Sequence, residues 1–493
     1  MSEQARRSAA PRSAPVEAGF LALALVFVGF GASLLPSLQH LVDEGTNVYA
    51  ARLIQQGQVP FRDFFYHQPP LHLALLALLP TDHIVWGRAA SLLATALSGR
   101  VLFEIARGLF PVASPAALLP VALFYFAALQ AYGSMALPNA WMLLFALLAA
   151  WLTLDRERVV GGAAAMVVAV LFKPIAIPLI FALLLALASV PARRREVVPL
   201  AATIGAGALL SYAVLHLTSD GAFSDLVRLQ AARYADETLL DILKGLPLLR
   251  DALLPWSSPV LNVLYHRHWV TSADLVLVLL ALPGIWLFVR GNRVGRGAAL
   301  LWPCWWLFSV LGVIYLWDVS WDHYHVLYLP PLALFGGFAL AALARRGLPG
   351  RIATVGLCVA FGVANLVTTW QKRQDYAPVL ALRGTEAPLL TFDTTLNVLS
   401  ATESPCGLLD YLAQRSPAFL GEPFARFRAT SADIVRCLEA EPTILVVVHQ
   451  LSNTGLLFFD AELFEAVRAL PPERVLYLGE GSREAFDALA EVL

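Results

Sequence analysis

The residues best suited to chemistry lie between positions 42 and 71, in the stretch VDEGTNVYAARLIQQGQVPFRDFFYHQPPL. Asp43 and Glu44 are adjacent carboxylates, Arg62 and Asp63 are an adjacent pair of opposite charge, and His67 precedes a Gln-Pro-Pro sequence. A carboxylate can take a proton from a hydroxyl group, and Arg or His can stabilise negative charge on a phosphate. This segment therefore has the groups needed for acid–base chemistry on an anionic substrate.

The composition indicates that these residues belong to a membrane protein. The chain has 493 residues, of which 58% are hydrophobic and 14% are charged, whereas a soluble protein carries roughly 25% charged residues. We therefore expect an α-helical polytopic membrane protein. The net charge of −1 identifies no partner, and we expect no nucleic-acid ligand.

Long apolar runs predict about eleven transmembrane helices. They lie near 18–35, 84–107, 113–130, 137–154, 159–173, 174–190, 197–217, 272–290, 298–317, 326–344 and 352–370. The fifth and sixth runs are interrupted at Lys173-Pro174, because proline disfavours helical backbone at the residue before it. Residues 1–17 are rich in Ser, Ala, Pro and Arg, and we expect a disordered tail on the cytoplasmic side.

The distribution of arginine predicts the orientation of the helices. Every second connection carries an arginine or an arginine cluster, whereas the short connections AYGSMA and DVSWDHYH contain neither Lys nor Arg. Basic residues favour the cytoplasmic side. The N-terminus is then cytoplasmic, and residues 371–493 lie outside the cytoplasm.

Two long connections, 36–83 and 218–271, fall on the external side. Loops of this length between helices are usually functional. In the first one, GTNVYAARLIQQG predicts a short amphipathic helix at the membrane surface that ends at Gly57. Asp43 and Glu44 would lie at the outer surface, where unpaired carboxylates are costly unless they bind a cation or a cationic side chain.

The last part of the chain has the pattern of a small α/β domain. APLLTFD, TILVVVH and RVLYLG predict short buried strands, and SADIVRCLEAE and SREAFDALAEV predict helices with Ser at the N-cap. Cys406 and Cys437 lie in this domain and could form a disulfide in an oxidising compartment or remain free thiols. Cys304 and Cys358 lie in apolar runs and are expected to be inert core residues.

Two stretches resemble a known family. DEG…Y.A..I..G..PFRDFF..QPPL is similar to the first external loop of polytopic C-type glycosyltransferases, which include the dolichyl-phosphate-mannose protein mannosyltransferases, the lipid A aminoarabinose transferases and their bacterial relatives. WDHYHVLYLPPLALF, at 321–335, is similar to a late HY…PPLALL segment of the same family. The predicted helix number, orientation and external C-terminal domain also agree with this family.

The resemblance implies transfer of a sugar from a polyprenyl-phosphate donor to an extracytoplasmic acceptor, with inversion. Asp43 matches the first acidic residue of the family motif and is the expected general base, and Glu44 would orient it or the acceptor. Asp63 would bind acceptor or, with Asp43, a divalent metal ion. The candidate contacts for the donor phosphate are Arg62, His67, Lys173, His323, Tyr324 and His325.

Each residue also has a simpler interpretation. Asp43 could cap the following helix, and Arg62 and Asp63 could form an exposed neighbour pair. Lys173 could be an interfacial lysine that extends toward the lipid headgroups. His67 could be an interfacial side chain without a task, and residues 323–325 could belong to an aromatic belt.

One position departs from the family pattern. The aminoarabinose transferases have a lysine before the Pro-Pro pair of the first loop that contacts the donor phosphate, and this chain has Gln68 there. The phosphate must then find positive charge elsewhere, or the donor differs.

Two other functions fit a polytopic protein with an external domain. The first is a transporter or flippase of lipid-linked saccharides, although transporters usually place ionisable residues near mid-membrane and have paired broken helices. The second is a non-catalytic envelope assembly protein that binds glycans. The residues identify neither the sugar nor the acceptor, which could be a cell-envelope glycan, a lipid or a protein. The composition suits a bacterial cytoplasmic (inner) membrane with a periplasmic site.

Overall fold

The fold comes from a computed structural model of the whole chain. It describes residues 13–38, 42–66, 68–111, 114–131, 133–235, 272–290, 296–311, 326–383, 387–391, 394–406, 430–449, 460–478 and 481–489.

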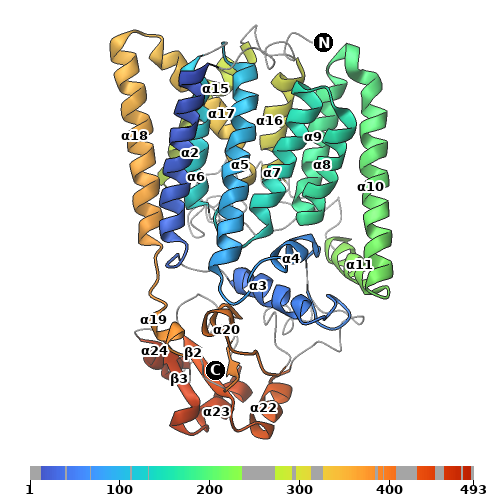
Figure 1. Ribbon diagram of the computed structural model, residues 1–493, viewed down its shortest axis with the longest axis vertical. Helices are drawn as coiled ribbons and strands as arrows, with labels where there is room; N and C mark the ends of the chain where they lie inside the picture. The colour runs from blue at the N-terminus through green and yellow to red at the C-terminus, as the bar shows by residue number, and fades with distance from the viewer. Residues whose placement is uncertain are drawn as a thin grey trace, which may run out of the picture.

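All eleven predicted apolar runs form helices within the described residues, and these helices make up one bundle (Figure 1). They are α2 (Ala14–Leu34), α5 (Val85–Leu109), α6 (Leu118–Gln130), α7 (Pro138–Ala150), α8 (Val159–Phe172), α9 (Ile177–Ala188), α10 (Val197–Thr218), α15 (Ser272–Arg290), α16 (Arg296–Leu311), α17 (Leu329–Ala344) and α18 (Leu348–Gln371). Short turns η1 (Pro115–Ala117), η3 (Pro174–Ala176) and η4 (Pro191–Glu196) precede α6, α9 and α10, and the π-helix η2 (Trp151–Asp155) continues α7. In the part of the chain that the structure describes, five helical spans are long and apolar enough to cross a membrane, and the other helices of the bundle are shorter apolar ones.

Several helix boundaries differ from the prediction by a few residues, and two of the helix starts have a local reason. Helix α2 begins at Ala14 rather than near residue 18, because Pro15 occupies its first turn, where proline is well tolerated. Helix α17 begins at Leu329 rather than near 326, with prolines again in its first turn. The predicted tail overlaps this earlier start of α2, and its residues 1–12 lie outside the described part of the chain.

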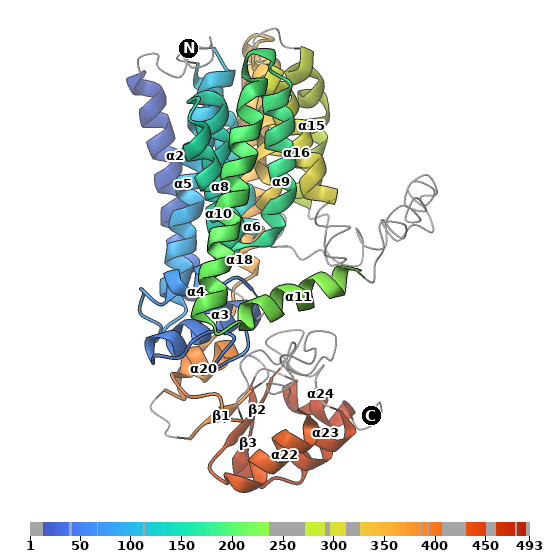
Figure 2. The same cartoon turned by 90° about the vertical axis from the view of Figure 1, so that its right-hand side faces the viewer.

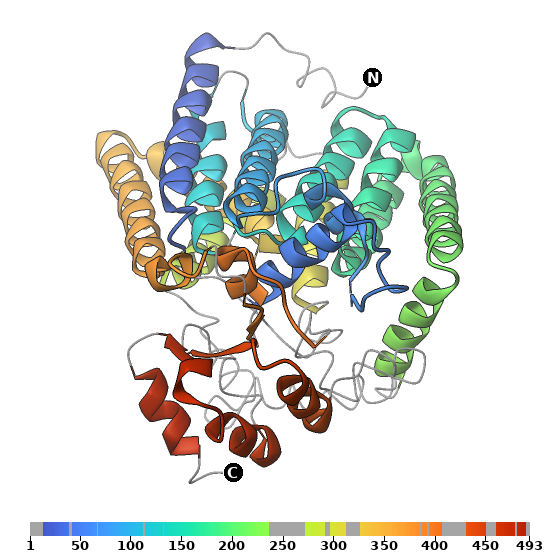
Figure 3. The ribbon, with the colours of Figure 1, turned by 60° about the horizontal axis from the view of Figure 1, so that its bottom comes forward.

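The first external connection forms a layer across one end of the bundle. It contains the amphipathic helix α3 (Val42–Gln55) and the short helix α4 (Leu71–Leu76), which pack against each other. Gly57 has a left-handed backbone conformation (φ 87°) and follows the end of α3, as predicted. Figure 3 shows α3 lying across the end of the bundle, close to the C-terminal region.

The second long connection begins with a helix that lies beneath the bundle. Helix α11 (Ala222–Ala235) turns away from α10 and runs below the bundle on the side of the C-terminal region (Figure 2). Residues 236–271 lie outside the described part of the chain.

The C-terminal region contains the predicted strands in a parallel sheet. Strands β1 (Leu389–Leu390), β2 (Leu445–His449) and β3 (Val475–Leu478) pair in the order β1-β2-β3. The helices of this region are α19 (Ala377–Leu380), α20 (Thr394–Ser400), α22 (Ser431–Ala440), α23 (Ala461–Arg468) and α24 (Ser482–Ala488), with the short turn η8 (Pro472–Arg474) before β3.

The predicted serine N-caps of α22 and α24 are each one residue too late. Thr430 caps α22, and its hydroxyl and the Asp433 carboxylate form a reciprocal capping box. Gly481, in a left-handed conformation, is the N-cap of α24. The two serines are therefore the first helical residues.

Cys406 and Cys437 form a disulfide that ties the segment after α20 to α22. The sequence left open whether these cysteines form a disulfide or remain free thiols, and the structure has the disulfide. Cys304 and Cys358 are free and half-buried among apolar neighbours of the bundle core.

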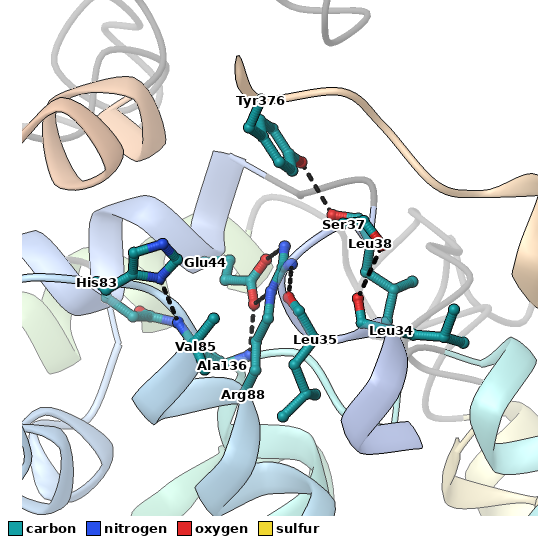
Figure 4. A network of polar contacts seen from close by, with 11 residues as sticks. Leu34, Leu35, Ser37, Leu38, Glu44, His83, Val85, Arg88, Ala136 and Tyr376 are labelled. Carbon is teal, nitrogen blue, oxygen red and sulfur yellow. Dashed lines mark hydrogen bonds and ion pairs between the residues drawn. The ribbon is translucent and has the colours of Figure 1, made fainter. Parts of the chain in front are cut away.

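One buried ion pair attaches α3 to the bundle. Glu44 accepts hydrogen bonds from Arg88 of α5 at both carboxylate oxygens, from Nε at 2.8 Å and from Nη2 at 2.7 Å. Both side chains are 0% exposed. Arg88 Nη1 also donates to the Leu35 carbonyl oxygen (2.6 Å), and the Ala136 amide donates to Glu44 (2.8 Å). As Figure 4 shows, this network joins the end of α2, the start of α3, helix α5 and the α6–α7 connection.

The C-terminal region approaches α3 at a glycine. A Cβ atom at Gly45 would lie 2.1 Å from the Thr395 backbone nitrogen of α20, so a side chain at position 45 would force the two helices apart. Nearby, the Thr46 and Thr394 hydroxyls lie 3.3 Å apart. Apolar side chains of α3, α11, α20 and the sheet share one core, which includes Val48, Phe223, Leu396, Val447 and Leu478.

Breaking the Glu44–Arg88 pair should destabilise the protein strongly. In Glu44→Gln the Arg88 charge would lose its counter-ion in a buried site, which typically costs about 3–5 kcal/mol. Thermal unfolding of detergent-solubilised protein should show a large fall in the midpoint temperature. The double variant Glu44→Gln with Arg88→Met should recover part of this loss. Arg228→Met, which removes an exposed pair with Asp225, should change the midpoint little, and an equally small effect of Glu44→Gln would contradict the assignment.

Removing the disulfide should loosen the C-terminal region. The two cysteines are separated by 31 residues, and the chain-entropy model gives a loss of about 3–4 kcal/mol for a loop of this length. Cys406→Ser with Cys437→Ser should unfold at lower temperature than the wild type, and reductant should have the same effect on the wild type. Cys358→Ser is the control. An unchanged midpoint in both experiments would exclude a stabilising disulfide.

Candidate functional site

The structure brings two of the predicted residues, Asp43 and Lys173, close enough to interact. Asp43 lies in the first turn of α3, where the positive end of the helix dipole stabilises a carboxylate. It is the second residue of the helix, and its side chain is half-buried. Lys173 lies in the connection between α8 and η3, and the Asp43 carboxylate acts electrostatically on its ammonium group.

Lys173 is held in place by the backbone break that the sequence predicted. Because Pro174 follows it, Lys173 has an extended conformation (φ −158°, ψ 125°) and ends α8. Its side chain is 4% exposed, and its Nζ donates to Asn139 Oδ1 at 2.9 Å. Burial lowers the pKa of Lys173 to about 8, and the Asp43 carboxylate opposes that shift.

Glu44 occupies a different environment from its neighbour Asp43. Both of its oxygens bind Arg88, and one also accepts the Ala136 amide. These bonds commit Glu44 to holding α3 against the bundle, and through α3 it orients Asp43.

Arg62 and Asp63 form an exposed pair in a turn. Arg62 Nε and Nη2 donate to the two Asp63 oxygens at 2.9 and 2.8 Å, and the Val59 amide donates to Asp63 Oδ2 at 2.7 Å. Arg62 also lies 3.9 Å from Asp220, in the turn between α10 and α11. Arg62 and Asp63 therefore have the geometry of an exposed neighbour pair, which was the simpler of the two interpretations.

Several predicted contacts lie outside the described residues. They are His67, His323, Tyr324 and His325. Gln68, which stands at the family's lysine position, is buried.

Three residues near the site were missed by sequence reasoning. Asn139 binds Lys173, Arg88 binds Glu44, and His72 of α4 lies within electrostatic range of Lys173. Arg88, within the apolar run 84–107, was a usable signal, because a buried charge in a membrane helix requires a partner. Asn139 and His72 follow prolines closely in the sequence, but nothing local distinguishes them from ordinary polar residues.

His72 is fully buried and bonded on one side. Its Nε2 lies 3.1 Å from the Ala136 carbonyl oxygen, which also accepts from Asn47 Nδ2 at 3.1 Å. Burial lowers the pKa of His72 to about 4, and the Lys173 charge contributes to the shift. His72 is therefore neutral near pH 7.

The predicted metal ion has no ready-made cluster of ligands in the described part of the chain. Within those residues, no three His, Cys, Asp or Glu side chains are grouped to hold a cation.

Comparisons with known proteins found no matching family model and no matching curated protein. Two of the solved structures that resemble this chain are crystal structures of the Archaeoglobus fulgidus oligosaccharyltransferase. One is the apo form (12% identity, TM-score 0.46, covering 78% of this chain and 64% of that chain). The other is tethered to an acceptor peptide containing the NVT sequon (12% identity, TM-score 0.45, covering 79% and 64%). This chain thus spans less than two thirds of the length of the enzyme that it resembles.

Proposed function

We propose that this protein is a membrane glycosyltransferase that moves a sugar from a polyprenyl-phosphate donor to an extracytoplasmic acceptor. The observation that carries the proposal is the interaction between Asp43 and the buried Lys173, at the end of the apolar bundle that bears α3. A partly exposed carboxylate beside a buried cation matches the two needs of the reaction, a base for a hydroxyl and a counter-charge for a phosphate. The similarity of the first external loop to C-type glycosyltransferases supports the same assignment.

In this mechanism Asp43 removes the proton of the acceptor hydroxyl while the hydroxyl oxygen attacks the anomeric carbon of the donor sugar. The bond between that carbon and the phosphate oxygen breaks, so the configuration inverts and the polyprenyl phosphate leaves. Lys173 stabilises the negative charge that grows on the phosphate, and Asn139 holds the lysine in position. Glu44 and Arg88 are positioning residues, because they act only through α3.

Arg62 and Asp63 have a secondary role in the proposal. Their exposed turn lies in the same connection as α3, where a larger acceptor could contact it. The donor would be a hexosyl or pentosyl polyprenyl phosphate, and the acceptor a glycan, lipid or protein of the cell envelope. The site would face the periplasm or cell exterior, with the N-terminus in the cytoplasm of a bacterium.

Replacing the proposed base should slow transfer strongly without abolishing donor binding. A positioned general base contributes about 10²–10⁴-fold to the rate, so Asp43→Asn should lower the turnover number by that factor. The assay uses proteoliposomes with radiolabelled undecaprenyl-phosphate sugars and cell-envelope acceptors. It measures the sugar transferred to the acceptor and the donor lipid that stays bound to the protein.

The matched control is Asp225→Asn on α11, which removes a half-buried carboxylate that pairs with Arg228 and should leave transfer unchanged. Movement of intact lipid-linked sugar across the bilayer, without release of sugar, would indicate a transporter instead. Binding of glycan with neither transfer nor transport would indicate an assembly protein. Transfer by Asp43→Asn at the wild-type rate would exclude Asp43 as the general base.

Binding of the donor phosphate should weaken as the pH rises above about 8. The Lys173 pKa of about 8 in the free protein means that the ammonium form predominates below this pH. A bound phosphate favours the charged lysine, so binding above pH 8 requires proton uptake and affinity should fall up to tenfold per pH unit. Titration with undecaprenyl phosphate between pH 7.5 and pH 9.5 tests this.

Lys173→Arg keeps its charge over the whole range and should show a flat profile, whereas Lys173→Met should bind weakly at every pH. A flat profile for the wild type would argue against Lys173 as the phosphate ligand.

A further inference from the structure

His72 combines complete burial with an unused hydrogen-bonding atom. The side chain is 0% exposed, and its Nε2 contacts the Ala136 carbonyl oxygen at 3.1 Å. A carbonyl oxygen can only accept, so Nε2 carries the proton and the neutral ring presents Nδ1 as an acceptor. Nδ1 has no hydrogen-bond partner among the described residues.

The ring is held firmly in this tautomer. The Ala136 carbonyl is also bound by Asn47, whose Oδ1 accepts from the Tyr66 hydroxyl at 2.7 Å. The Ala136 amide is bound by Glu44. The edge of the His72 ring faces Phe172, with 6.5 Å between ring centroids.

The charge around His72 keeps Nδ1 an acceptor. The nearby Lys173 ammonium and the buried surroundings both disfavour a second proton on the ring, so its pKa falls to about 4. The Asp43 carboxylate favours the charged form of Lys173. At neutral pH, Lys173 can only donate and His72 Nδ1 can only accept.

These two neighbouring groups are complementary to different parts of a sugar phosphate. The ionised phosphate oxygens of a polyprenyl-phosphate sugar only accept, so they suit Lys173 and not Nδ1. A sugar hydroxyl can donate, and it would satisfy a buried acceptor that is otherwise costly to leave unpaired. The hydroxyl on the ring carbon next to the anomeric carbon lies closest to the phosphate.

We propose that His72 Nδ1 accepts a hydrogen bond from the donor-sugar hydroxyl adjacent to the anomeric carbon, and that it thereby selects donors with a free hydroxyl at that position. The inference rests on the proposed function and names the substrate class of the same site. It makes His72 a specificity-determining residue rather than a base, because burial and the Lys173 charge both disfavour a second proton on the neutral ring.

Two substitutions separate the two nitrogens of the ring. In His72→Gln the side-chain amide nitrogen can replace Nε2 as donor to the Ala136 carbonyl, while the acceptor at the Nδ1 position is lost. In His72→Asn the amide oxygen can replace Nδ1, while the bond to Ala136 is lost. The probes are undecaprenyl phosphate, its glucose, mannose, galactose and arabinose derivatives, and their 2-deoxy analogues. Binding to full-length protein in nanodiscs is measured by native mass spectrometry.

The wild type should bind at least one sugar derivative more tightly than undecaprenyl phosphate. The 2-deoxy analogue of that derivative should bind with an affinity roughly tenfold lower than the parent sugar derivative. His72→Gln should lose the same roughly tenfold and bind parent and 2-deoxy derivatives equally, with undecaprenyl phosphate binding unchanged. His72→Asn should keep the preference for the hydroxyl, with a lower thermal midpoint.

The other outcomes identify which proposal fails. If no sugar derivative binds more tightly than undecaprenyl phosphate, the proposed function fails and this inference fails with it. If a sugar is preferred but its 2-deoxy analogue binds equally well, the donor assignment stands and the His72 contact is overturned. If His72→Gln behaves as wild type and His72→Asn loses sugar binding, His72 serves only to hold Ala136, and the inference is likewise overturned.

Discussion

The site depends on one buried ion pair. Glu44 and Arg88 are both fully buried, and neither charge could remain in such an environment without the other. Their hydrogen bonds to Leu35 and Ala136 use further polar atoms of the pair. The pair therefore determines where α3 begins relative to α2, α5 and the α6–α7 connection, and so where Asp43 lies.

Helix α3 is shared by the bundle and the C-terminal region. On one side it is held by the ion pair, and on another Gly45 allows the backbone of α20 to approach closely. Tyr376 follows α18 in the chain, and its hydroxyl donates to the Leu38 carbonyl oxygen at 2.9 Å. This bond is a second link between the bundle and the C-terminal region. The helix that carries the proposed base therefore packs against both the bundle and the C-terminal region.

The buried polar groups at this end of the bundle differ in their hydrogen-bond partners and therefore in the role that we assign to them. In the Glu44–Arg88 pair the two charges neutralise each other, and the pair holds α3 against the bundle. Lys173 is instead bonded to the neutral Asn139 and interacts with the half-buried Asp43. A buried cation of this kind has a strong preference for an anion, since burial penalises its charge. His72 supplies the complementary property, a neutral acceptor fixed by the Ala136 carbonyl. Together they provide a donor and an acceptor within electrostatic range of each other, which suits a ligand that has a phosphate next to a hydroxyl.

The sequence by itself determined the apolar helices, the break at Lys173, the amphipathic α3 and the strands of the C-terminal region. These features follow from hydrophobicity, periodicity and proline, which act over a few neighbouring residues. It also singled out Asp43 and Lys173, but not their interaction. Only the tertiary structure decided that Glu44 pairs with Arg88, 44 positions away, that His72 lies near Lys173, and that Cys406 bonds Cys437. Those partners are brought together by packing between distant segments, and no local pattern specifies which polar groups will meet when apolar surfaces are buried.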